Sequence, residues 1–223
     1  MPTINANRIG TGTGVVSSNF HTARTSNAAS VVDGATGTFI VQYFSASGRG
    51  GGTKRFKRMF LHFDTSSITS TLTAAHVDID GSLLSPDPND TIMLKSTAFG
   101  GDGGTALAAT DFFSSIDYST AYSTELTSWS VNNNEYTLTS GALADIKNND
   151  NFTLAIVEHD NDAANSDQGD NAYDISINLG VTITLDYTLA PTGYSHAVNG
   201  VAAANISKVN GVATASIDKV IGV

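Results

Sequence analysis

Residues 58–63 read Arg-Met-Phe-Leu-His-Phe, and this run decides the fold class. Met59, Leu61 and Phe63 alternate with the other three residues, which is the period of two that a β-strand shows. Similar β-branched or aromatic runs, each bounded by Gly, Asn, Asp, Ser or Pro, recur at residues 38–44, 75–80, 91–95, 135–138, 152–157 and 181–187. Together these runs predict an all-β fold, an antiparallel β-sandwich or jelly roll. One short helix is predicted at residues 140–147, where it would cap one end of the sandwich.

The composition excludes several classes of protein. Charged residues make up only 14% of the 223 residues, and 21 acids against 11 Lys and Arg give a net charge of −10. Such a chain is not expected to form a helical bundle or a coiled coil. It also lacks the positive field that collects phosphates, so we expect no nucleic-acid partner. Because cysteine is absent, a disulfide framework and a thiol nucleophile are excluded.

The apolar pattern gives no sign of a membrane partner or of export. No run approaches the roughly 18 apolar residues of a membrane-spanning helix. The first residues lack the apolar segment of a secretory signal peptide. We therefore expect a protein without an export signal and without a membrane partner.

The sequence predicts three parts. Residues 1–18 are predicted as an N-terminal arm and residues 19–189 as the β-sandwich. Residues 190–223, which begin with a linker punctuated by Pro and Gly, are predicted as a C-terminal arm of 11-residue repeats.

The repeats of this arm admit two structures. The sequence Val-Asn-Gly-Val-Ala at residues 198–202 recurs 11 residues later at 209–213, and a reduced form ends the chain. Asn-Gly between valines is typical of a hairpin turn, which would give a β-ribbon. Alternatively, each Ala-rich stretch is a helical turn that ends at Asn-Gly, and the spacing of Ile206 and Val209 favours this version.

Such short repeats cannot bury a core alone and need something to stack on. We therefore expect the arm to be an ordered interface for anchoring or for forming oligomers of three or more copies. The expected interface residues are Val198, Val201, Ile206, Val209, Val212, Ile217 and Val220.

Two charged stretches are candidates for binding. An acidic stretch offers Glu158, Asp160, Asp162, Asp167 and Asp170 as calcium ligands, although it departs from EF-hand spacing, and a solvated acidic loop is the preferred interpretation. A basic stretch offers Arg49, Lys54, Arg55 and Lys57 for contact with an anionic partner, either an acidic patch on another copy or lipopolysaccharide phosphates. The alternative for the basic stretch is a glycine loop that leads into an edge strand protected by Lys and Arg.

Catalytic patterns are weak, so we expect no enzyme. The five histidines are scattered, and no Gly-x-Ser-x-Gly motif occurs. A glycan-binding module is the other hypothesis, and it predicts an exposed aromatic platform formed by Trp129, Tyr118, Tyr122 or Tyr136. Apart from calcium at the acidic stretch, no cofactor is expected.

Two resemblances extend these predictions. Residues 56–68 and 72–79, with Phe-Asp-x-Ser-Ser-Ile at their centre, resemble the opening of DNRLRE-type domains, which are carbohydrate-binding-module-like β-sandwiches of bacterial surface and secreted proteins. The resemblance continues loosely through residues 19–189, and His62 stands where the pattern usually has Arg. The repeated tail is similar to the C-termini of structural proteins of tailed bacteriophages.

Together these features predict a non-enzymatic virion structural protein. The resemblance of the tail implies a capsid decoration, head-fibre or tail-associated subunit that is assembled in the host cytoplasm and found in the virion. Its implied partners are copies of itself, other virion proteins such as the major capsid or tail protein, and a host surface glycan. The alternative is a glycan-binding adhesion module of a cell surface or fibre.

Overall fold

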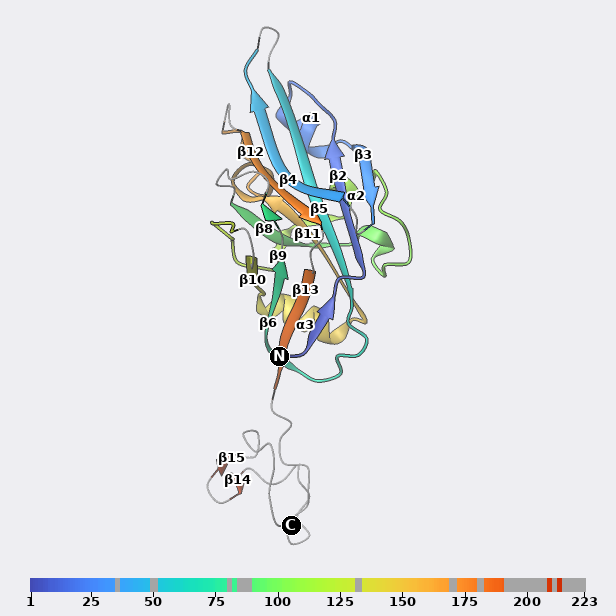
Figure 1. The fold of residues 1–223 in the computed structure, drawn as a ribbon, viewed down its shortest axis with the longest axis vertical. Helices are drawn as coiled ribbons and strands as arrows, with labels where there is room; N and C mark the ends of the chain where they lie inside the picture. Colours follow the sequence, from blue (N-terminus) through green and yellow to red (C-terminus); the bar gives the residue numbers. More distant parts are fainter. Residues whose placement is uncertain are drawn as a thin grey trace. The chain divides into compact units, whose positions relative to one another are not determined.

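The computed structural model describes residues 1–34, 37–48, 52–79, 82–83, 90–130, 134–168, 172–179, 183–190, 208–209 and 212–213. The chain divides into two compact units, Met1–Thr188 and Leu189–Val223. The first unit is built mostly from antiparallel β-strands in two sheets, which confirms the predicted all-β sandwich (Figure 1).

The larger sheet contains nine strands. Its main path is β7 (Ser82–Leu83), β12 (Ala172–Leu179), β4 (Gly37–Ala46), β5 (Thr53–Asp64), β11 (Asn151–Glu158), β8 (Thr91–Ser96) and β9 (Ile116–Ala121). Off this path, β2 (Arg8–Gly14) pairs with both β5 and β3 (Ala28–Asp33). The smaller sheet has the order β1 (Thr3–Asn5), β13 (Ile183–Leu189), β6 (Leu72–Ile79) and β10 (Asn134–Thr137).

Strand β5 is the centre of the larger sheet. Lys57 pairs with Thr13 of β2 and with Gln42 of β4, while the following half of β5, from Met59 onward, pairs with β11. The prediction that the basic stretch leads into an edge strand is therefore wrong. Strands on both sides satisfy the backbone of β5, so its Lys and Arg residues do not protect an open edge.

Both faces of β5 are covered from Met59 to Phe63, and this explains why this part of the strand is mainly apolar on both faces. Met59, Leu61 and Phe63 are completely buried in the core shared with the smaller sheet. Phe60, on the opposite face, is also completely buried, in a second cluster with Phe99. Burial of each such side chain contributes roughly 1.5–3 kcal/mol.

Helix α3 (Ser140–Asn148) covers the residues predicted to be helical, but it contributes side chains to the core, whereas it was expected only to cap one end. The hydroxyl of Thr139 accepts a hydrogen bond from the N–H of Ala142, which caps the helix N-terminus. Ala142 and Ile146 lie one turn apart and are buried among the core residues of both sheets. The helix ends at Asn148, and the chain turns directly into β11.

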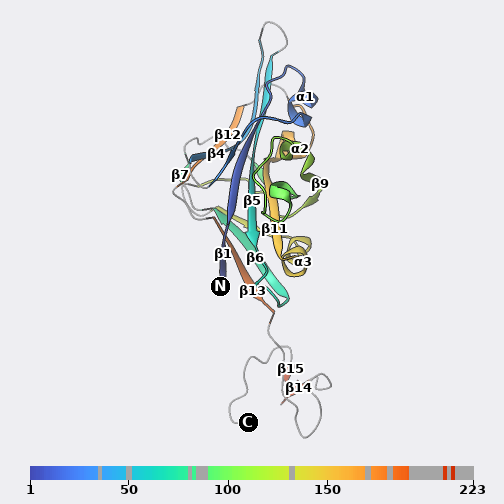
Figure 2. The ribbon, with the colours of Figure 1, turned by 90° about the vertical axis from the view of Figure 1, so that its right-hand side faces the viewer.

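The face of the larger sheet that carries Phe56 is covered by the short helices α1 (Phe20–Thr25) and α2 (Asp111–Ser114). Both helices lie on the same side of β5 in Figure 2. A short 3-10 helix, η1 (Ala98–Gly100), precedes α2 in the chain. Strand β2 packs closely against this layer. A Cβ atom at Gly12 would lie 2.6 Å from the Phe112 ring, and one at Gly14 would lie 2.8 Å from it.

The expected N-terminal arm is instead part of the sandwich, because β1 pairs with β13 and β2 pairs with β5. Glycine is depleted in strands, so the alternating glycines of β2 give this segment a low strand propensity. Here the absence of a side chain has a use: it leaves room for Phe112 against the strand.

In the second unit, residues 208–209 and 212–213 form a β-ribbon. β14 (Lys208–Val209) pairs antiparallel with β15 (Val212–Ala213), and Val209 lies opposite Val212. This pairing agrees with the ribbon version of the prediction, while residues 201–207, the Ala-rich stretch of the helical version, lie outside the described residues. Two residues, Asn-Gly, separate the strands in the sequence, and this pair favours a tight hairpin flanked by β-branched residues.

Candidate functional site

The acidic stretch forms a π-helical turn, η2 (His159–Ala163), at the end of β11. The buried carboxylate of Glu158 accepts hydrogen bonds from the backbone N–H groups of Asp160, Asn161 and Asp162 at 2.8–3.0 Å. It also accepts one from Asn161 Nδ2 at 3.1 Å. Burial raises the pKa of Glu158, while these hydrogen bonds oppose the rise. Glu158 is therefore a buried cap for the turn. This differs from the solvated acidic loop, which was the preferred interpretation, and from the candidate calcium ligand.

Asp162 is the counter-ion of a buried arginine. Its two carboxylate oxygens accept from Arg58 Nε at 2.6 Å and from Arg58 Nη2 at 2.8 Å. Arg24 Nε lies 3.3 Å from Asp162 Oδ1, and the Tyr118 hydroxyl donates to the same oxygen at 3.2 Å. Asp162 thus has protein partners at both oxygens, which a calcium ligand would have to give up.

The two guanidinium groups are enclosed by aromatic rings and carbonyl groups. Arg58 is completely buried, lies 4.1 Å above the centre of the Phe112 ring and donates to the Phe112 carbonyl. Arg24 lies 4.2 Å above the Tyr118 ring. Arg58 shares a face of β5 with buried Phe60, so the alternation of the strand places it inside the protein, away from any external anion.

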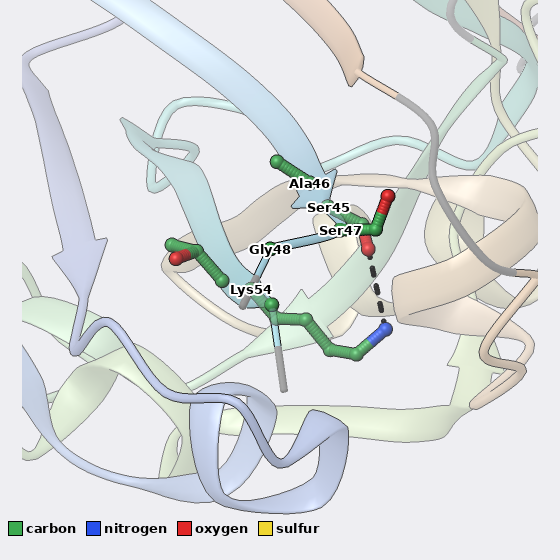
Figure 3. Close-up of a pocket in the computed structure, with 7 residues that line it drawn as sticks. Ser45, Ala46, Ser47, Gly48 and Lys54 are labelled. Atoms are coloured by element: carbon green, nitrogen blue, oxygen red, sulfur yellow. Dashed lines mark hydrogen bonds between the residues drawn. The ribbon is translucent and has the colours of Figure 1, made fainter. Parts of the chain in front are cut away.

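Of the expected anionic-partner residues, Lys54 lines a hollow of about 220 Å³ at the β4–β5 hairpin (Figure 3). Lys54 Nζ donates to Ser45 Oγ at 3.2 Å, as Figure 3 shows, and pairs with Asp167 Oδ1 at 2.6 Å. Arg55 Nη2 donates to Gln42 Oε1 at 2.9 Å. Lys54 and Arg55 thus already have partners within the chain. Lys57 is half-buried, and Arg49 lies outside the described residues.

The aromatic residues do not form the expected exposed platform. Tyr122 and Tyr136 are 3% and 1% exposed and belong to the core. Trp129 is half-buried, packs edge-on against Tyr136 and donates its Nε1 hydrogen to Thr91 Oγ1 at 3.1 Å. The half-buried Tyr118 is fixed by Arg24 and Asp162. Period-two sequence patterns do not distinguish such core aromatic residues from a sugar-stacking surface.

A second polar hollow, of about 250 Å³, lies beside Tyr122. Its wall includes Lys95, Asn151 and Thr153. The Lys95 ammonium group lies 2.7 Å from Asp145 Oδ2, an oxygen to which the Tyr122 hydroxyl also donates. Lys95 and Tyr122 of this hollow are thus held by the same carboxylate, that of Asp145.

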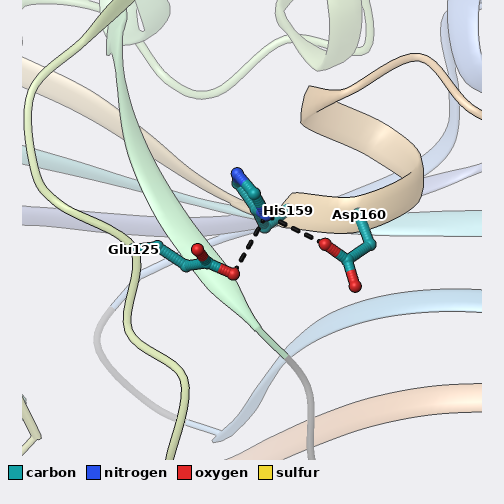
Figure 4. Close-up of side chains that lie close together, drawn as sticks. All are labelled: Glu125, His159 and Asp160. Carbon is teal, nitrogen blue, oxygen red and sulfur yellow. Dashed lines mark hydrogen bonds and ion pairs between the residues drawn. The ribbon is translucent and has the colours of Figure 1, made fainter.

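The candidate calcium ligands that the structure describes do not converge on one point. Glu158, Asp162 and Asp167 each have the protein partners described above, and Asp170 lies outside the described residues. Within the described part of the chain, the group of side chains that could hold a metal ion is Glu125, His159 and Asp160 (Figure 4). Glu125 lies far from the acidic stretch in the sequence and belongs to no motif, so no local pattern identifies it.

The chain matches no protein-family model, and no curated protein matches it. Among the described residues, no helix has both the length and the apolar character needed to cross a membrane. The function must therefore be inferred from the arrangement of the chain itself.

Of the expected arm interface, Val212 is exposed and the backbone of Val209 is described. Exposure of a β-branched residue on a two-stranded ribbon is consistent with an interface, because such a ribbon has little core of its own. The remaining residues expected in this interface, Val198, Val201, Ile206, Ile217 and Val220, lie outside the described residues.

Proposed function

We propose that this chain is a non-enzymatic structural protein of a bacteriophage virion, a capsid decoration, head-fibre or tail-associated subunit. In this proposal Met1–Thr188 is the displayed β-sandwich and Leu189–Val223 joins copies to one another or to other virion proteins. The observation that carries the proposal is the division of the chain into a unit with its own core and a second unit of 11-residue repeats.

The charged groups of the first unit support a structural role. Glu158 caps a turn, Asp162 neutralises Arg58, and Lys54 pairs with Asp167. These acids and bases are used to hold the fold together, whereas an active site needs titratable groups that face a cleft and are free to react.

Assembly through the second unit can be tested by mass photometry of the full chain. We expect oligomers of three or more copies, and we expect the double substitution Val209→Asp and Val212→Asp to release monomers. Val32→Asp is the matched control, because Val32 is 56% exposed and Val212 is 50% exposed. A monomeric wild-type chain, or oligomers that survive the double substitution, would contradict this part of the proposal.

The location in a virion needs a separate measurement. In lysates that contain the chain, it should co-sediment with intact particles, and mass spectrometry of purified particles should detect it in a fixed ratio to the major capsid protein. A chain that remains with the free soluble proteins would refute the virion proposal.

The glycan-binding alternative has less support. Two of the four rings that could form its platform, Tyr122 and Tyr136, are buried. Loss of glycan-array binding on Trp129→Ala, with the fold intact, would favour this alternative over the structural role.

A further inference from the structure

Three side chains of types that can bind metal ions converge where β11 ends. His159 Nδ1 lies 3.0 Å from Glu125 Oε1 and 3.0 Å from Asp160 Oδ1. The three ligand atoms all lie within 4.8 Å of one another, and Figure 4 shows the two carboxylates approaching the same ring nitrogen. The side chains of Glu125, His159 and Asp160 are 32%, 33% and 45% exposed, so a dissolved ion can reach them.

The charges of this cluster are unbalanced. Elsewhere in the described residues, Asp162 faces two arginines and Asp145 faces a lysine. Glu125 and Asp160 share a single imidazole nitrogen, and their ion pairs in the described part of the chain involve neither Lys nor Arg. One imidazole carries at most one positive charge, so the cluster is negative whether or not the ring is protonated. A divalent cation would neutralise it.

The backbone holds these side chains in place independently of their contacts with one another. Leu126, next to Glu125, exchanges two backbone hydrogen bonds with Thr91, at 2.8 and 3.1 Å. The N–H of His159 donates to the Asp90 carbonyl at 2.7 Å. Binding an ion would therefore require side-chain adjustments, with little ordering of the backbone.

We propose that Glu125, His159 and Asp160 form a binding site for a divalent first-row transition metal ion. One imidazole nitrogen and two carboxylate oxygens suit Zn²⁺ or Mn²⁺, whereas Ca²⁺ takes six to eight oxygen ligands. Water would complete the coordination on the exposed side. The ion would join the segment before β10 to the start of η2, two regions that are distant in the sequence.

The test is isothermal titration of Zn²⁺ into the chelator-treated full chain. We expect one saturable equivalent and a loss of affinity of more than about tenfold in both Glu125→Gln and His159→Gln, since even supporting residues of metal sites affect affinity by roughly 10- to 100-fold. His76→Gln is the matched control, because His76 Nε2 lies 3.7 Å from both Glu135 and Asp186 without forming a metal-binding cluster. Its affinity should equal that of the wild type.

A second measurement makes the result independent of overall stability. Mn²⁺ should broaden the ring NMR signals of His159 selectively, and circular dichroism should show that both glutamine variants remain folded. The proposal is overturned if the wild-type chain shows no saturable binding, if Glu125→Gln and His159→Gln bind as tightly as the wild type, or if His76→Gln abolishes binding. These outcomes do not depend on whether the protein belongs to a virion.

Discussion

Arg58→Met would remove a buried charge while keeping a side chain of similar length. Arg58 is completely buried and Asp162 is 1% exposed, so the substitution leaves the carboxylate inside the protein without its bidentate partner. Removal of one member of a buried ion pair costs about 3–5 kcal/mol. For a chain of this size, this loss corresponds to a fall of roughly 6–20 °C in Tm.

The assay is urea unfolding followed by fluorescence of Trp129, which packs against core Tyr136. Arg8→Met is the matched control, because the Arg8–Asp33 pair is longer, at 3.4 Å, and partly exposed. Its loss should stay below about 1 kcal/mol. If Arg58→Met destabilises the protein no more than Arg8→Met does, then the buried Arg58–Asp162 pair does not stabilise the fold as expected.

Three further predictions concern stability. Gly12→Val should destabilise the fold by about 1–3 kcal/mol in urea unfolding, because the new side chain meets the Phe112 ring, and an unchanged midpoint would exclude the tight contact. Thr139→Ala should cost about 1 kcal/mol through loss of the α3 cap, whereas Thr139→Ser should restore most of it. Hydrogen bonds from Ser119 and then Thr120 lower the pKa of Asp117 below its ordinary 3.8. The contribution of the Asp117 carboxylate to the free energy of unfolding is therefore fully present above pH 3.8, and it is lost as the pH falls through the lower pKa of the folded state. Asp117→Asn should therefore destabilise the protein at pH 6 but much less under strongly acidic conditions, and an equal loss at both pH values would contradict this assignment.

The strands with β-branched or aromatic alternation could be predicted from the sequence. Residues 58–63 lie in β5, residues 152–157 lie in β11, and the predicted helix corresponds to α3. Here local patterns and tertiary burial agree, because the same alternation that favours a strand also separates its two faces. Strand β2 could not be recognised in this way, since the need for its glycines arises from Phe112, far along the chain.

The charged residues show a different limit of sequence reasoning. Arg58 stands among basic residues, and Asp162 stands in an acidic run, so each resembles a solvated surface group when considered locally. Only the pairing of β5 with β11 brings the two segments together and makes them partners. Glu125 likewise meets His159 only in the folded chain. Long-range contacts of this kind have no local signal in a single sequence.

The position of β5 also has a consequence for how the chain folds. Its partners β2 and β4 lie close to it in the sequence, whereas β11 is made much later, and Arg58 and Asp162 are 104 residues apart. The pairing of β5 with β11 slows folding, because the long chain segment between them must form a closed loop before these two strands can meet. During synthesis, the backbone N–H and C=O groups of β5 that later pair with β11 therefore remain unpaired, next to an apolar surface, until β11 has been made. This interval is when neighbouring nascent chains can pair with it and aggregate.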